Sequence, residues 1–169
     1  MSPTAPRRIV TGHDGDGRSV VLSDGATPTT HVFPTGAIFH EIWSTAGAPV
    51  PLGAAEPGEP TDGPLRVPPG PLGTIVHVID MPPGASAPMH RTKTVDYGMV
   101  LDGEVYLELD DGTETRMVTG DVVVQRGTAH GWSNRSDRVA RMLFVMVDGA
   151  FTEDLRSALG EDALSQLLE

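Results

Sequence analysis

The chain has 169 residues, enough for one domain with a substantial core, and its 38% hydrophobic and 21% charged residues are typical of a globular protein. The net charge of −11 repels phosphate backbones and anionic lipid surfaces, so we expect neither nucleic acid nor a membrane as a partner. The absence of cysteine excludes disulfides, thiolate metal sites and a cysteine nucleophile, and without a long apolar segment we expect a cytoplasmic protein.

Short apolar or alternating segments recur along the chain between turns that contain Gly, Pro or Asp, and they predict strands. The expected strands are 8–11, 18–22, 37–43, 74–80, 104–109, 116–118, 122–124 and 140–147. The segment 13–17 predicts a hairpin turn rather than a calcium loop, because the acidic ligand that such a loop needs downstream is missing. The last strand, 140–147, is an apolar run suited to a strand that is covered on both faces. Strands this short and evenly spaced predict an all-β sandwich or barrel.

Residues 46–73 predict a long surface loop, which we expect to cover part of a site. In this segment 14 of the 28 residues are Gly or Pro, and neither residue supports a regular ladder or helix. A linker between two domains is the weaker alternative, because the residues before it are too few for a core of their own. We therefore expect one domain over residues 1–169.

The tail predicts a short helix on the outside of the β structure. Thr152 suits the N-cap, and four leucines from Leu155 to Leu167 keep roughly helical spacing. Gly160 is expected to break the helix into two short pieces.

Two blocks of sequence carry residues that point to chemistry. At fixed intervals they contain Gly84, His90, Asp96 and Gly103, and then Gly120, Gly127, His130 and Asn134. These blocks resemble the paired motifs of the cupin superfamily, over about residues 74–147. The resemblance implies a double-stranded β-helix, or jelly-roll barrel, here with extra N-terminal strands and a short C-terminal helix.

The resemblance also implies a metal site, although this chain departs from the family pattern. Thr92 stands where the first motif has its second histidine, the carboxylate is Asp96 rather than Glu, and Gln125 replaces the proline of the second motif. His90, Asp96 and His130 remain, and two imidazoles with one carboxylate suit Fe, Mn, Zn or Ni. Residues 90, 92 and 96 share parity, so on one strand they would face the same side.

A substrate pocket is expected around these residues, with Thr92 and Trp132 in its wall. Trp132 lies two residues after His130 and should share its face. The leading hypothesis is a metal-dependent small-molecule enzyme that catalyses oxygenation, isomerisation, decarboxylation or elimination on a modest organic substrate. The alternatives are metal-free acid–base catalysis of the isomerase or dehydratase type, with His90 or His130 as the base and Asp96 orienting it, and ligand binding without catalysis.

The other histidines are not expected to be ligands. His40 and His77 are each flanked by apolar residues, which predicts partly buried strand positions, although either could supply a missing donor by pointing inward. His13 and His31 are expected to be exposed.

A homodimer is expected. Cupins often pair through their N-terminal strands, and residues 8–45 have strand character outside the motif region. Tyr97 has the opposite parity to Asp96, so we expect it to face outward, toward a second sheet or a partner.

Overall fold

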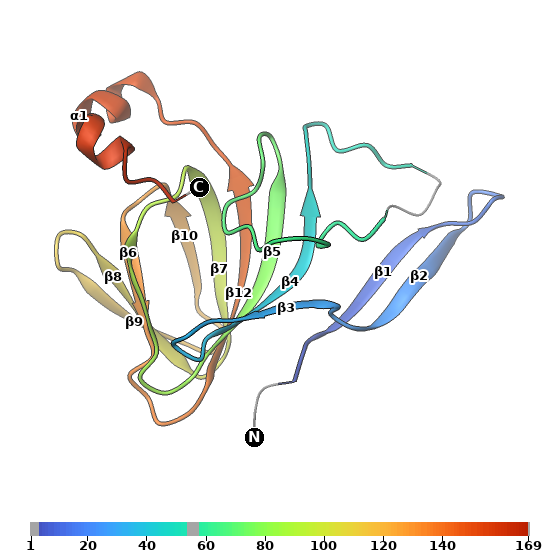
Figure 1. Cartoon of the computed structure of the whole chain (residues 1–169), viewed down its shortest axis with the longest axis horizontal. Coiled ribbons are helices and arrows are strands. Elements are labelled where there is room, and N and C mark those ends of the chain that lie inside the picture. Colours follow the sequence, from blue (N-terminus) through green and yellow to red (C-terminus); the bar gives the residue numbers. More distant parts are fainter. Residues whose placement is uncertain (1–3, 54–57, 169) are drawn as a thin grey trace.

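The computed structural model describes residues 4–53 and 58–168, in which strands form three antiparallel sheets (Figure 1). The strands are β1 (Arg7–His13), β2 (Ser19–Ala26), β3 (Thr29–Val32), β4 (Ile38–Thr45), β5 (Thr74–Met81), β6 (Ser86–His90), β7 (Thr94–Asp102), β8 (Glu104–Leu109), β9 (Glu114–Val118), β10 (Val122–Arg126), β11 (His130–Ser133) and β12 (Ala140–Asp148). One helix, α1 (Glu153–Leu164), follows them.

Two sheets form the barrel. The larger has the order β10-β7-β12-β5-β4-β3 and the smaller the order β6-β11-β8-β9, so neighbours in space are mostly distant in sequence. Figure 1 shows the smaller sheet, with β6, β8 and β9, curving opposite β7, β12 and β5. The predicted jelly-roll barrel, with extra N-terminal strands and a short C-terminal helix, is confirmed.

The core lies between the two sheets because alternate side chains of each strand point inward. Along β12, the inward residues Met142, Phe144 and Met146 are buried, whereas the outward Leu143 and Val145 are partly exposed. Cover on both faces is predicted for this segment, and within the single chain the outward face is only partly covered. In the described part of the chain the outer face at β7 and β10 is exposed, and only the inner face is packed.

The N-terminal hairpin has the predicted turn and extends away from the barrel (Figure 1). Backbone N–H groups of Asp16 and Arg18 both donate to Oδ1 of Asp14, each over 2.9 Å. Gly17 follows with a φ of 78°, a left-handed conformation that glycine adopts without strain. Asp14 is thus a turn-forming residue.

A buried polar network ties the N-terminal segment to the outer face of the larger sheet. His40 Nε2 lies 2.9 Å from Asp80 Oδ2, and the guanidinium of Arg141 donates to both oxygens of Asp80 over 2.6 and 2.8 Å. Arg141 also donates to the carbonyl of Thr4 over 2.8 Å. His40, expected to be partly buried, is fully buried, and its other ring nitrogen, Nδ1, lies 3.1 Å from the hydroxyl of Thr30.

The predicted loop 46–73 runs from β4 to β5 and contacts both the hairpin and the core. Its residues 54–57 lie outside the described part of the chain. Glu59 pairs with Arg8 at 2.5 Å, and Val67 packs against the hydrophobic core.

The helix α1 begins after Thr152, as predicted, but the Thr152 side chain makes no capping hydrogen bond. Gly160 interrupts it with a φ of 75°, also as predicted, and none of its residues is buried. After α1 the chain returns to the barrel, where the N–H of Leu168 donates to the carbonyl of Arg91 over 2.8 Å. Among the described residues, no helix is long and apolar enough to cross a membrane.

Replacing Met142 by Ala should lower the free energy of unfolding by about 2–5 kcal/mol, because its side chain is fully buried between the sheets and alanine leaves a cavity. Met89→Ala is the matched control, because Met89 lies on β6 and is 47% exposed. The decrease in the free energy of unfolding should be several-fold smaller for this control variant than for Met142→Ala. Urea denaturation of both variants measures the difference, and equal losses would contradict the described packing.

Candidate functional site

A cavity of about 330 Å³ lies between the two sheets, and its walls are mainly apolar. Ile79, Met142, Phe144 and Trp132 are among the side chains that form these walls. The titratable and amide side chains that reach it are His77, His90, Asp96, Gln125 and His130. A mostly apolar cavity with a few convergent polar groups is typical of small-molecule sites.

His90 and His130 come together on the smaller sheet. They are paired across β6 and β11, and their ring centroids lie 4.3 Å apart. Each Nδ1 lies close to the carbonyl oxygen of the residue two positions earlier, at 2.8 Å for His90 and 3.0 Å for His130.

These backbone contacts determine the tautomer of both rings. A carbonyl oxygen only accepts hydrogen bonds, so each Nδ1 carries the proton, and in the neutral ring Nε2 carries a lone pair. Burial lowers the pKa of His130 to about 4, so this ring is neutral near pH 7. In the neutral form of each ring, the pair therefore brings two Nε2 lone pairs to the cavity wall.

Asp96 reaches the same cavity from the opposite sheet. The chain leaves β6 at His90 and enters β7 at Thr94, so residues 90, 92 and 96 do not share one strand. The parity argument therefore fails for Thr92: it is buried, its hydroxyl lies 2.7 Å from that of Thr94, and it is not part of the cavity wall formed by the described residues. Burial raises the pKa of Asp96.

Trp132 lies in the cavity wall beside His130, on the same face of β11. Its ring makes edge contacts with Phe144, at 5.7 Å between centroids, and with His130, at 6.4 Å. The indole thus contacts both the imidazole pair of the smaller sheet and an apolar side chain of the larger sheet.

Three buried polar side chains in the wall have atoms without a hydrogen-bond partner among the described residues. The unpaired atoms are His77 Nε2, Asp96 Oδ1, and both amide atoms of Gln125. Gln125 and Asp96 are direct neighbours across β10 and β7. His77 faces the cavity from β5, and burial lowers its pKa to about 4.

The predicted metal ligands fit a metal ion in part. His90 and His130 present the lone pairs that borderline metals accept, and their Nδ1 contacts are the kind that orient metal-bound histidines. The carboxylate of Asp96 does not complete the set, since no three His, Asp or Glu side chains form a metal-binding group within residues 4–53 and 58–168. The donor set therefore does not fit a three-ligand metal site.

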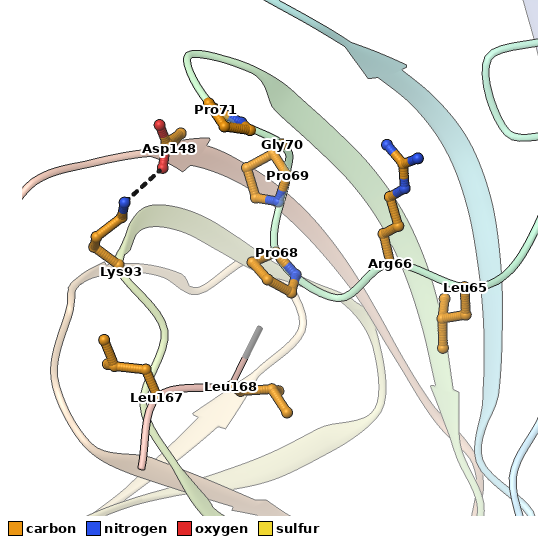
Figure 2. A pocket seen from close by; sticks show the side chains of 10 residues that line it. All are labelled: Leu65, Arg66, Pro68, Pro69, Gly70, Pro71, Lys93, Asp148, Leu167 and Leu168. Atoms are coloured by element: carbon orange, nitrogen blue, oxygen red, sulfur yellow. Dashed lines mark ion pairs between the residues drawn. The ribbon is translucent and has the colours of Figure 1, made fainter. Parts of the chain in front are cut away.

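Two segments outside the motif blocks also line the cavity. Val67 of the Pro/Gly-rich loop and Leu168 of the tail both line it. Leu168 also lines an outer groove between the loop and the tail, in which Lys93 pairs with Asp148 at 3.7 Å (Figure 2). The expectation that the loop borders the site is thus met by one residue, Val67.

The sequence analysis missed His77 and Gln125 as cavity residues. A signal was present for each. His77 alternates in phase with Ile75 and Ile79, which places it on the apolar face of its strand. Gln125 is a departure from the motif at a position that faces inward.

His31, expected to be exposed, is instead half-buried, with Nε2 2.6 Å from Glu41 Oε1.

The fold and the cavity define a jelly-roll barrel protein with an internal small-molecule cavity. The family profile described as Cupin domain matches residues 77–146. Phomopsin biosynthesis cluster protein C' of Diaporthe leptostromiformis is 39% identical over 152 residues, which cover 85% of this chain and 78% of the relative. The chain belongs to the cupin superfamily.

Other similar proteins agree with this assignment. Cupin-domain-containing oxidoreductase fogC of Aspergillus ruber is 39% identical over 148 residues, which cover 83% of this chain and 71% of that protein. Among solved structures, the Cnp3 cupin domain of Schizosaccharomyces pombe has a TM-score of 0.52 at 14% identity, covering 92% of this chain and 96% of that domain. This last likeness concerns the fold alone.

Because the pKa of His77 is lowered, we predict that the free energy of unfolding decreases at acidic pH. Unfolded, the imidazole takes up a proton near pH 6.5, whereas in the folded protein it does so only near pH 4. Between these values the unfolded state holds more protons, so the free energy of unfolding decreases as the pH is lowered. From pH 6.5 to about pH 5, His77 should account for a loss of about 1.5 kcal/mol.

His77→Phe should remove this part of the pH dependence. His130 contributes in the same direction as His77 and Asp96 in the opposite one, but both are present in wild type and variant, so their contributions cancel in the difference. Urea denaturation at several pH values measures both slopes. Identical slopes would show that His77 titrates normally, and hence that it does not lie buried in the cavity wall.

Proposed function

We propose that this protein is an enzyme that transfers protons on an apolar small molecule, with His130 as the acid–base group and His90 as a hydrogen-bond acceptor for the same ligand. The observation that supports this most strongly is the pair of imidazoles, 4.3 Å apart, whose Nδ1 atoms are held by backbone carbonyls. Positioned histidines are the commonest general acids and bases in enzymes.

The geometry suits a transfer in which Nε2 of His130 takes a proton from one position of the substrate and returns the same proton to another, while the lone pair on Nε2 of His90 accepts a hydrogen bond from the same ligand. His130 is the base in this scheme, because its lowered pKa keeps Nε2 unprotonated. His90 stands beside it on the neighbouring strand, close enough to act on the same ligand. An isomerisation or a dehydration needs such a transfer, and the apolar walls limit the water that competes for the proton.

The names of the relatives support a role in small-molecule metabolism. One is assigned to phomopsin biosynthesis and another is called an oxidoreductase. A metal-dependent reaction is the second candidate, favoured by the two lone pairs of the imidazoles. Its weakness is the missing third donor, so we derive no step through a metal.

Hydrogen–deuterium exchange on an enolisable ketone tests the proposal. In D₂O the protein should catalyse exchange of the α-protons of 2-tetralone, an apolar ketone, and His130→Gln should reduce the rate by about 100-fold or more. His13→Gln, at an exposed position on the hairpin, is the control and should leave the rate unchanged. NMR spectroscopy follows the exchange.

Metal analysis accompanies this experiment. The proposal predicts no stoichiometric metal in the purified protein and a rate unaffected by EDTA. A rate abolished by EDTA and restored by one divalent ion would favour the second candidate. An equal rate in wild type and His130→Gln would overturn the assignment of the base.

We further propose that a second copy of the chain covers the outer face of the larger sheet. There Tyr97, Met99 and Leu101 of β7 lie exposed beside Val122 and Val124 of β10. The hairpin β1–β2 extends from the same chain with Ile9 and Val21 exposed, and two-stranded hairpins are barely stable in water without a partner. Large exposed apolar faces of this kind are typical of protein interfaces.

The mass in solution tests this interface. Light scattering should give twice the chain mass of 17.9 kDa for the wild type, and Tyr97→Lys should shift the protein toward the monomer because it places a charge in the apolar face. Leu155→Lys on α1, also at an exposed apolar position, should leave the dimer intact. A monomeric wild type would contradict the proposal.

A further inference from the structure

We infer that Gln125 and Asp96 form a recognition pair for a neutral ligand that carries a hydrogen-bond donor and acceptor side by side, such as a carboxamide or a hydroxy-carbonyl group, on an apolar body. This inference names the ligand class of the cavity, and it rests on the proposed function only in taking a small molecule as the ligand.

The first step is the burial of the unpaired groups. Gln125 and Asp96 are each 3% exposed and His77 is 1% exposed, yet none of the four atoms named above has a partner in the described part of the chain. A buried polar group without a hydrogen bond is costly, and folded proteins leave few of them.

Elsewhere in the described residues, buried polar side chains are paired. His40 is bonded to Asp80, Glu41 to His31, and the amide of Asn134 donates to the carbonyls of Met81 and Arg138, each over 2.8 Å. The unpaired buried side-chain atoms of the described residues all belong to the wall of this one cavity. Because these unpaired polar atoms gather in the wall of one cavity, we take a ligand in that cavity to be their hydrogen-bond partner.

The second step is the geometry of the pair. Gln125 and Asp96 face each other across β10 and β7, so their side chains lie next to one another on the inner face. The amide of Gln125 offers both a donor and an acceptor, and Oδ1 of Asp96 adds a third polar atom. A ligand group with a donor beside an acceptor can pair with the amide at two points.

The third step concerns the body of the ligand. In the sheet order, β12 lies between β7 and β5, so His77 stands two strands, about 10 Å, from Asp96. Phe144 and Met146 of β12 fill the wall between them. A ligand that contacts both ends must therefore lay a flat or elongated apolar body across these side chains.

The fourth step concerns charge. Among the described residues no lysine or arginine lines the cavity, so an anionic group would enter without a counter-ion and would meet Asp96. The ligand is thus expected to be neutral.

Four naphthalene probes with the same body separate these features: 2-naphthamide, methyl 2-naphthyl ketone, 2-naphthoate and naphthalene. Isothermal titration calorimetry should rank the naphthamide first, about tenfold or more tighter than naphthalene, because it satisfies both amide atoms of Gln125. The ketone, which only accepts, should fall between them, and the anionic naphthoate should bind most weakly.

Gln125→Met should abolish the preference for the naphthamide while leaving naphthalene binding intact, which also shows that the variant is folded. Gln166→Met, at an exposed position, is the matched control and should retain the preference. A wild type that binds the four probes equally, or a Gln125→Met variant that keeps the preference, would overturn the inference.

Binding by His130→Gln distinguishes this inference from the proposed function. If the exchange experiment fails while the naphthamide preference persists in this variant, the recognition pair stands and the catalytic role falls. If exchange depends on His130 but the protein shows no preference for the naphthamide, the catalytic role stands and the recognition pair falls.

Discussion

The site depends on two hydrogen bonds between imidazole Nδ1 atoms and backbone carbonyls. Because Pro88 and Thr128 contribute these carbonyls from the strand ends that carry His90 and His130, the backbone itself fixes the orientation and tautomer of both rings. Pairing of β6 with β11 then brings the rings together. If either ring were free to turn, the Nε2 lone pairs would no longer face a common ligand.

The two sheets contribute different kinds of polar side chain to the cavity wall. The smaller sheet contributes the imidazole pair, whereas the larger sheet contributes the unpaired groups of Asp96, Gln125 and His77. This separation places a candidate acid–base centre opposite a candidate recognition surface, with apolar side chains between them. A ligand held by its polar end against one sheet would present its body to the other.

The sequence was sufficient for the fold and for part of the site. Alternating strands, turn residues and the two motif blocks predict the barrel, and the parity of His130 and Trp132 correctly places both on one face. The relation of His90 to Asp96 could not be predicted, because the break at residues 91–93 sends them into different sheets.

Other features depend on long-range contacts that no local pattern encodes. The register of β10 on β7 places Gln125 against Asp96, and the network around Asp80 joins His40 to Arg141, which in turn bonds to Thr4 from the opposite end of the chain. Val67 and Leu168 border the cavity only because a loop and a tail, remote in sequence, meet at one end of the barrel.

The protonation of the two rings is the most direct test of this account. Nitrogen-15 NMR of labelled histidines, assigned with His90→Gln and His130→Gln variants, reports which nitrogen carries the proton. We predict a proton on Nδ1 of both residues, because each faces a backbone carbonyl, and for His130 an unprotonated Nε2 near pH 7 that stays so until the pH approaches 4. An Nδ1 without a proton in either residue, or a His130 that titrates near pH 6.5, would contradict the geometry on which the proposed chemistry rests.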